Sequence, residues 1–159
     1  MTVNVGVIGV GMIGQDHIRR LTYVLSGARV SAVTDVDLER AKSVAQGLPG
    51  EVAVHATGRD LINDDAVDAV VVASWGPTHE EFVLAGIEAG KQVFCEKPLA
   101  TTREACDHIV DAVPPQYVSD MIINDTCVHD VDMARSCWTR RLSPRGCSDR
   151  GRTARHPST

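Results

Sequence analysis

The sequence predicts an α/β fold in which a doubly wound parallel sheet of the Rossmann type occupies residues 1–113. Three observations carry this prediction. Short apolar runs alternate with segments of helical period, which is typical of parallel strands joined by crossover helices. A glycine-rich turn, G-x-G-x-x-G, follows the first apolar run and opens the first helical segment. The alternation stops after Val113, where Pro114 and Pro115 prevent a helix from continuing.

The first half of this region holds two strand–helix units. The apolar run VNVGVIG at residues 3–9 predicts a strand, and a helix follows from about Met12. The run ARVSAVT at 28–34 predicts the second strand, and its helix ends at the glycine–proline cluster 47–50. The apolar faces of the two helices comprise Gly14, Ile18, Leu21 and Leu25 in the first and Leu38, Ala41, Ala45 and Leu48 in the second.

Three more apolar runs predict the rest of the sheet. EVAVHA at 51–56 is expected to be a short strand, DAVVVAS at 68–74 the central strand and KQVFCE at 91–96 another buried strand. The segment RDLIND is expected to form a single helical turn. Two pairs have capping-box spacing and predict helix starts, namely Thr78 with Glu81 and Thr101 with Glu104. The last helix is expected to bury Ala105, Ile109 and Ala112.

The glycine turn has the spacing of a dinucleotide-binding site. Gly9 and Gly11 permit a tight turn and a close approach of the backbone to a pyrophosphate, and Gly14 lets the helix pack closely on the strand. Met12 and Ile13 open the helix, whose free N–H groups and positive dipole end would face the phosphates. Glycine turns occur in many strand–helix units, so a second feature is needed.

Asp35 supplies that second feature. It ends the second predicted strand, 21 residues past Gly14, where a carboxylate accepts hydrogen bonds from the ribose hydroxyls of the adenosine. The same carboxylate would repel a 2′-phosphate, and no arginine follows until Arg40, so the sequence favours NAD over NADP. The alternative is that Asp35 and Asp37 only cap the following helix.

Composition narrows the partners. Residues 1–134 carry 9 basic and 20 acidic side chains, whereas residues 135–159 carry 7 arginines and one aspartate. A basic tail can bind nucleic acid or membranes, but these arginines are accompanied by neither a repeat of aromatic residues nor a Gly/Arg repeat. We therefore expect neither partner. The apolar runs are far shorter than the ~20 residues of a membrane span, and no secretory leader is recognised, so we expect a cytoplasmic protein.

The cysteines point to free thiols. There are five of them, with no C-x-x-C pair, and an odd number argues against a closed disulfide framework. An alternative zinc site can be drawn from Cys127, His129, Cys137 and Cys147, but its spacing matches no familiar pattern, and we expect no metal.

Three further motifs indicate a family. They are SWGPTHE at residues 74–80, CEKPLATT at 95–102 and SDMIINDTCVHDVD at 119–132. With the glycine turn, and in this order, they resemble the glucose-fructose oxidoreductase/inositol dehydrogenase (Gfo/Idh/MocA) family, and most of all its inositol 2-dehydrogenases. The resemblance implies NAD as cofactor, a small polyol or sugar-like substrate, and oxidation of a ring hydroxyl of myo-inositol to the ketone.

The resemblance also implies a catalytic set. Lys97 matches the active-site lysine, and Asp125 and His129 match the acid–histidine pair. The chemistry agrees, because hydride leaves a hydroxyl-bearing carbon only as the hydroxyl proton leaves, and a histidine with a pKa near ~6.5 is a suitable base. Asp125 and His129 stand at i and i+4, so they would share one face if this segment is helical. Taken singly, His129 is more often structural and an E-K-P turn is more often only a turn, so the joint occurrence carries the interpretation.

Lys97 is expected to hydrogen-bond the reacting oxygen. Desolvation beside a positively charged nicotinamide would lower its pKa, and Pro98 would aim it through extended backbone angles or a cis bond. Trp75 and Pro77 are expected to wall the nicotinamide pocket, with His79 as a polar residue near the helix cap. The cofactor-binding set comprises Gly9, Gly11, Met12, Ile13, Gly14, Asp35, Ser74, Trp75, Pro77, Glu96 and Lys97.

The chain departs from the family after Val113. The family continues with a mostly antiparallel α+β domain, whereas here residues 114–135 resemble only a remnant from inside it, so we expect an internal deletion at the Val113/Pro114 junction. Residues 136–159 are rich in Arg, Ser and Pro, and we expect them to be disordered. We interpret them as the product of a frameshift that replaces the rest of the family's second domain, so that the chain is truncated relative to the family. A family-like homo-oligomer is not expected without the second sheet.

Three functions therefore stay open. The first is a truncated inositol dehydrogenase with little or no turnover, because catalysis depends on closely held groups. The second is an inactive gene fragment or a stand-alone NAD-binding module. The third is an interaction protein that uses an exposed sheet edge and the basic tail.

Overall fold

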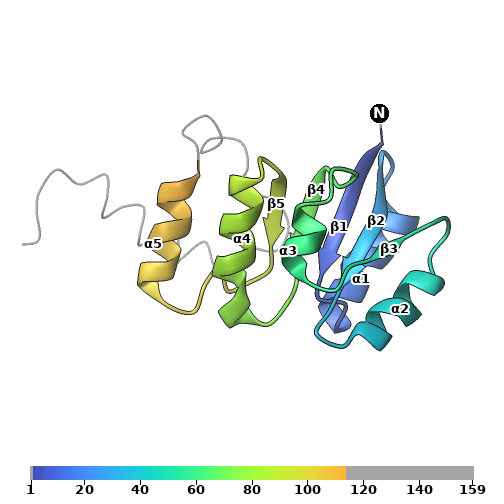
Figure 1. Ribbon diagram of the computed structural model, residues 1–159, viewed down its shortest axis with the longest axis horizontal. Coiled ribbons are helices and arrows are strands. Elements are labelled where there is room, and N and C mark those ends of the chain that lie inside the picture. The colour runs from blue at the N-terminus through green and yellow to red at the C-terminus, as the bar shows by residue number, and fades with distance from the viewer. Residues whose placement is uncertain (1, 114–159) are drawn as a thin grey trace, which may run out of the picture. The chain divides into compact units, whose positions relative to one another are not determined.

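Five parallel strands form one sheet in the order β3-β2-β1-β4-β5 (Figure 1). The computed structural model describes residues 2–113. The strands are β1 (Val3–Ile8), β2 (Ala28–Thr34), β3 (Ala53–Val54), β4 (Ala69–Val72) and β5 (Gln92–Cys95). The helices are α1 (Met12–Tyr23), α2 (Leu38–Gln46), α3 (Gly58–Ile62), α4 (His79–Glu88) and α5 (Arg103–Ala112), with a 3₁₀ turn, η1 (Gly76–Thr78), before α4. This strand order is that of the doubly wound Rossmann sheet, which confirms the predicted fold class.

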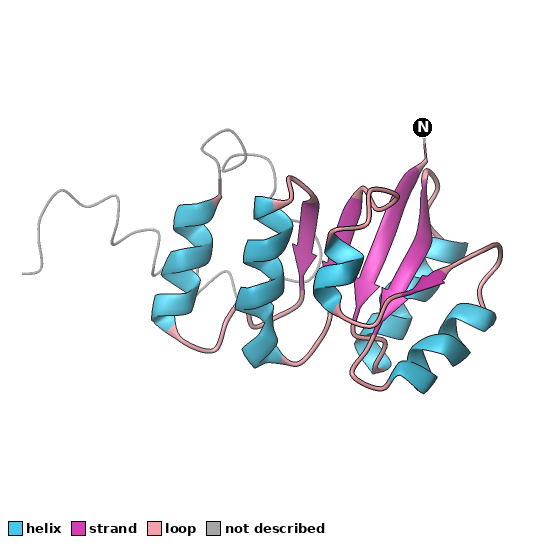
Figure 2. Cartoon of the chain, in the orientation of Figure 1, coloured by secondary structure: helices cyan, strands magenta, loops and turns pink. Residues whose placement is uncertain are grey.

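Helices cover both faces of the sheet (Figure 2). Helices α1 and α2 pack on one face, where Val7 and Val33 lie fully buried beside Ile18 and Ala41. Helices α3, α4 and α5 pack on the other face, around a second group of buried side chains: Ile8, Leu61, Val72, Val83 and Ile109. Strands covered on both faces need apolar residues at nearly every position, which is why β4 reads as one alanine followed by three valines. The run at 68–74 was expected to be the central strand, but that place belongs to β1, and β4 lies next to it.

The predicted elements are confirmed, but two predictions of burial are wrong. The strand at 91–96 was expected to be buried, whereas β5 is an outer strand with no buried residue, and Phe94 is 42% exposed. Leu38, expected on the apolar face of α2, is 36% exposed at the first position of that helix.

Two helix ends also differ from the prediction. Leu25 lies beyond the last residue of α1 and is exposed, so the buried face of this helix stops at Leu21. Ala112, in the last turn of α5, is exposed as well, whereas Ala105 and Ile109 are buried as expected. Helix ends fray and project past the sheet, so periodicity overestimates how far an apolar face extends.

Both capping predictions need correction. The residue that caps α5 is Thr102, whose hydroxyl accepts from the N–H of Ala105 at 3.2 Å, rather than Thr101. Thr78 does precede α4, but its hydroxyl donates to the Trp75 carbonyl at 2.7 Å instead of accepting from the helix. Thr78 therefore stabilises the turn between β4 and α4.

None of the helices within residues 2–113 is both long and apolar enough to cross a membrane. Several predictions lie outside the described residues and stay predictions. They are the remnant at 114–135, the tail at 136–159, the helix bearing Asp125 and His129, and the alternative zinc site.

Candidate dinucleotide-binding site

Strands β1 and β4 lie side by side at the centre of the sheet, and the chain leaves them toward opposite faces. The loop after β1 leads to α1 on one face, and the loop after β4 leads to α4 on the other. The two loops are tied together, because the N–H of Ala73 donates to the Ile8 carbonyl at 2.8 Å. In open α/β sheets, ligands bind outside the carboxyl ends of the strands at such a switch point.

Each glycine of the turn has its own structural reason. Gly9 has a φ of +92°, and a Cβ there would lie 2.6 Å from the Ala73 carbonyl oxygen. A Cβ on Gly14 would collide with the carbonyl oxygen of Gly9, so α1 packs directly on the turn. A Cβ on Gly11 would meet nothing within 4 Å, so the space before the first turn of α1 is open. This cradle fits a pyrophosphate held by the N–H groups of α1.

Asp35 links the end of β2 to the glycine turn. Its Oδ2 accepts from the N–H of Val10 at 2.7 Å, and its Oδ1 accepts from the N–H of Asp37 at 2.9 Å and from Nη2 of Arg40 at 2.6 Å. Burial opposes ionisation, but the bonds from Asp37, Arg40 and Val10 outweigh it and lower the pKa of Asp35. Asp35 is therefore a charged group at neutral pH. Asp37 caps α2 through the N–H of Arg40, so the two aspartates have different roles.

This arrangement makes part of the stability depend on pH. Because the folded-state pKa of Asp35 lies below the unfolded value of 3.8, its contribution is complete above that pH and is lost as the pH falls through the folded-state pKa. We expect Asp35→Asn to lower the free energy of unfolding at pH 7 by about 1–2 kcal/mol. The difference from the parent should narrow below pH 3.8. Urea unfolding at several pH values measures it.

Asp107→Asn is the matched control, because Asp107 is about half exposed and its pairing with Arg103 is long, at 3.8 Å. We expect it to change the free energy of unfolding by less than about 0.5 kcal/mol. A gap between Asp35→Asn and the parent that stays constant into acid would contradict the assigned role of the Asp35 charge.

Apolar side chains stand exposed around the switch point. Trp75, in the loop after β4, is 75% exposed, and Met12, at the start of α1, is 83% exposed. Ser74 bonds its hydroxyl to that of Thr78 at 2.7 Å, and Pro77 lies exposed in η1. Large apolar groups that remain in water beside a backbone cradle are typical of a binding surface.

The E-K-P motif follows β5 and so lies at the carboxyl ends of the strands, as the glycine turn does. Glu96 accepts from the N–H of Lys97 through Oε2, at 3.1 Å, and its Oε1 lies 2.7 Å from Nε2 of His17 in α1. The Lys97–Pro98 bond is cis, one of the two alternatives that the sequence left open. Lys97 is an exposed residue, so residues 2–113 do not supply the desolvation expected for it. His17 was missed by sequence reasoning, because a histidine on a helix carries no local signal of a partner 79 residues away.

His79 has a larger structural role than the predicted polar cap residue. It is 1% exposed, and its two ring nitrogens each face a backbone carbonyl. Nδ1 lies 2.7 Å from the Pro98 oxygen, and Nε2 lies 3.0 Å from the Ser74 oxygen. One buried imidazole thus connects the loop after β4 with the turn that carries Lys97.

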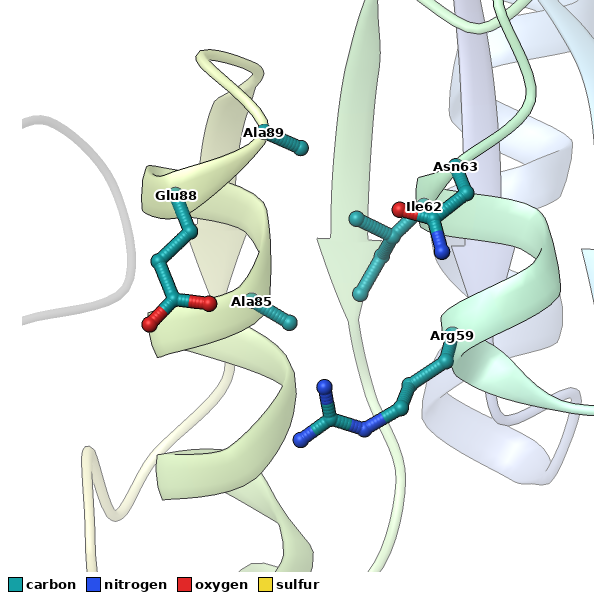
Figure 3. A pocket seen from close by; sticks show the side chains of 6 residues that line it. All are labelled: Arg59, Ile62, Asn63, Ala85, Glu88 and Ala89. Carbon is teal, nitrogen blue, oxygen red and sulfur yellow. The ribbon is translucent and has the colours of Figure 1, made fainter.

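Two other features contribute no chemistry to this site. Burial, and next the Glu96 charge, raise the pKa of the Cys95 thiol to about 12, so it is not a nucleophile at neutral pH. A shallow pocket lies between α3 and α4 (Figure 3). It is lined by Arg59, Ile62, Asn63, Ala85, Glu88 and Ala89. These residues come from α3, from the C-terminal half of α4 and from the residue that follows each helix, away from the glycine turn. Arg59 also pairs with Glu81, in the first turn of α4, at 2.7 Å.

The structure therefore brings the described members of the predicted cofactor-binding set to the carboxyl ends of the strands. Its elements place Gly9, Gly11, Met12, Ile13, Gly14, Asp35, Ser74, Trp75, Pro77, Glu96 and Lys97 there. The glycine turn, the switch point and the carboxylate after β2 define a dinucleotide-binding Rossmann domain.

Residues 3–119 match the family model GFO_IDH_MocA, described as an oxidoreductase family with an NAD-binding Rossmann fold. The chain belongs to this family, which confirms the resemblance deduced from the motifs.

Relatives of known name agree. An inositol 2-dehydrogenase of Azotobacter vinelandii is 61% identical over 112 residues, which cover 70% of this chain and 33% of the relative. One from Serratia proteamaculans is 39% identical over 182 residues, covering 85% of this chain and 54% of the relative. The crystal structure of myo-inositol dehydrogenase from Lactobacillus casei, in complex with NAD(H) and myo-inositol, superposes with a TM-score of 0.70 at 35% identity, covering 89% of this chain and 42% of that one.

The chain thus spans between a third and about half of the length of these relatives. The alignment with the Serratia protein extends over 182 residues, more than the 159 of the whole chain. That relative therefore contains residues within the aligned region that have no counterpart here.

Proposed function

We propose that this chain binds NAD at the switch point and derives from an enzyme that oxidises a ring hydroxyl of myo-inositol to the ketone. The observation that carries the proposal is the glycine cradle, with Gly9 and Gly14 packed tightly and Gly11 open, beside an ionised Asp35. The inositol dehydrogenases among its relatives support the substrate class. As an inositol dehydrogenase, the protein acts in inositol catabolism, in the cytoplasm.

The residues of this chain divide the chemistry among them. NAD, when bound, accepts a hydride from the carbon that bears the reacting hydroxyl. Lys97 donates a hydrogen bond to the reacting oxygen, and His129 takes the hydroxyl proton, so the C–H and O–H bonds are replaced by a C=O bond. Asp125 orients the imidazole or holds a neighbouring hydroxyl of the substrate. Of these three residues, the described part of the chain contains Lys97.

A second candidate is a stand-alone NAD-binding module. It is favoured by the exposure of Lys97 and Trp75, because an enzyme excludes water from the reacting atoms. The residues of the Serratia protein that have no counterpart in this chain favour the module too. Together with the break in the sequence pattern after Val113, they lead us to infer an internal deletion at that point. A family-like homo-oligomer is not part of either proposal.

The first test is NADH binding by the full chain, followed by nucleotide fluorescence. Gly11→Val points a branched side chain into the open space before α1, where the pyrophosphate would lie. We expect it to weaken NADH binding at least tenfold, about 1.4 kcal/mol or more, and to leave the melting temperature nearly unchanged. Equal binding by the parent and the variant, or none by the parent, would refute the cofactor site.

Turnover separates the two candidates. NADH formation from NAD and myo-inositol is measured by absorbance, with Lys97→Ala as the control for chemistry at the E-K-P turn. Turnover that disappears in Lys97→Ala establishes the enzyme. NADH binding without inositol-dependent reduction establishes the module.

A further inference from the structure

Arg40 reaches back from the first turn of α2 to the end of β2. Its Nη2 lies 2.6 Å from Oδ1 of Asp35, and its Nη1 lies 4.0 Å from Oδ2 of Asp37. The sequence interpretation discounted Arg40 because it lies five residues past Asp35, but the helix turn places its guanidinium against that carboxylate. The arginine side chain is 43% exposed, whereas that of Asp35 is 5% exposed. The guanidinium therefore forms the solvent side of this pair.

The ion pair between Arg40 and Asp35 reduces the number of acceptor positions that the carboxylate can offer to a ribose at the end of β2. The two oxygens of a carboxylate offer about four positions for donors. Three are taken, by the N–H groups of Val10 and Asp37 and by Arg40. A ribose diol therefore shares Asp35 with the guanidinium, and the negative charge that would repel a 2′-phosphate is already paired.

We propose that Arg40 is a specificity-determining residue that offsets Asp35 and donates to the 2′-phosphate of NADPH, so that the chain binds NADPH as well as NADH. This inference rests on the proposed dinucleotide site. A guanidinium matches phosphate oxygens with parallel N–H donors, and Arg40 has further N–H groups besides the one that Nη2 donates to Asp35. Asp35 and Asp37 both face Arg40, so two carboxylates act against one cation, and NADH stays the preferred ligand.

The experiment titrates the full chain with NADH and with NADPH, followed by nucleotide fluorescence at low and moderate salt. For Arg40→Gln we expect NADPH binding to weaken about tenfold and NADH binding to change less than about threefold. The matched control is Lys42→Gln, which removes the same charge from the same helix at a residue paired with Glu39 at 2.7 Å. The control should move the two affinities together, by less than about twofold. The NADPH affinity of the parent should also fall more steeply with salt than its NADH affinity.

Asp35→Asn supplies the reciprocal test. It frees Arg40 from its carboxylate, so we expect NADPH binding to tighten, and the double variant with Arg40→Gln should lose that gain. An unchanged NADPH-to-NADH ratio in Arg40→Gln, or an equal loss of both nucleotides, would overturn the inference and leave the NAD site standing. A parent chain that binds NADH but no NADPH would overturn it as well. Binding of neither nucleotide would refute the proposed function itself, and this inference with it.

Discussion

Replacing Gly9 with alanine is expected to lower the free energy of unfolding by about 3 kcal/mol or more, because two costs add. The φ of +92° is strained for any residue with a Cβ. That Cβ would also lie 2.6 Å from the Ala73 carbonyl oxygen and 2.7 Å from Cα of Ser74, which are backbone atoms that cannot rotate away. Thermal unfolding by circular dichroism should show a melting temperature lower by roughly 10 °C or more.

Gly27 provides the control for this prediction. It has a φ of +85°, close to that of Gly9, but a Cβ there would meet nothing within 4 Å. Gly27→Ala should therefore cost only the backbone term, about 1–2 kcal/mol. Equal losses in the two variants would show that the packing of the turn against the β4 loop adds nothing. In that case the tight cradle described for the pyrophosphate would be wrong.

The glycine turn shows how much the sequence could predict. A strand must end and a helix begin within three residues, and only a few residue types permit this, so spacing alone located Gly9, Gly11 and Gly14 correctly. Apolar runs likewise located every strand, and most clearly β1, β2 and β4, since a strand buried on both faces has little freedom of composition. These predictions succeeded because each depends on residues that are close together in the chain.

The contacts missed from the sequence join distant segments. His17 meets Glu96 across 79 positions, and nothing near either residue indicates the other. Arg40 was judged too far from Asp35 because distance along the chain was taken for distance in space, and the first turn of α2 reverses that judgement. Thr101 was predicted as the cap from its capping-box spacing with Glu104, but α5 begins at Arg103, and the hydroxyl that accepts from the N–H of Ala105 is that of Thr102, which has no Glu or Gln three positions on.

Among the residues that contact distant segments of the chain, His79 matters most to the site. Replacing it with leucine removes both ring nitrogens and leaves the carbonyls of Ser74 and Pro98 without the buried partner that lies 3.0 and 2.7 Å from them. We expect the free energy of unfolding to fall by about 2–4 kcal/mol. His79→Gln keeps an amide that donates to one carbonyl, so it should recover part of the loss. His108→Leu, at a histidine paired with Glu80 on the surface, should change it by less than about 0.5 kcal/mol.

A local measurement separates positioning from general stability. Because His79 holds two loops to each other, His79→Leu should speed hydrogen exchange in residues 74–78 and 96–100 more than in β1 and α1. The glycine turn should then still bind NADH, while the turn that carries Lys97 becomes more mobile. Exchange that rises evenly over the whole sheet would show that His79 only fills the core. If the effect is local, the two loops that carry Trp75 and Lys97 form one unit, organised by the buried imidazole between them.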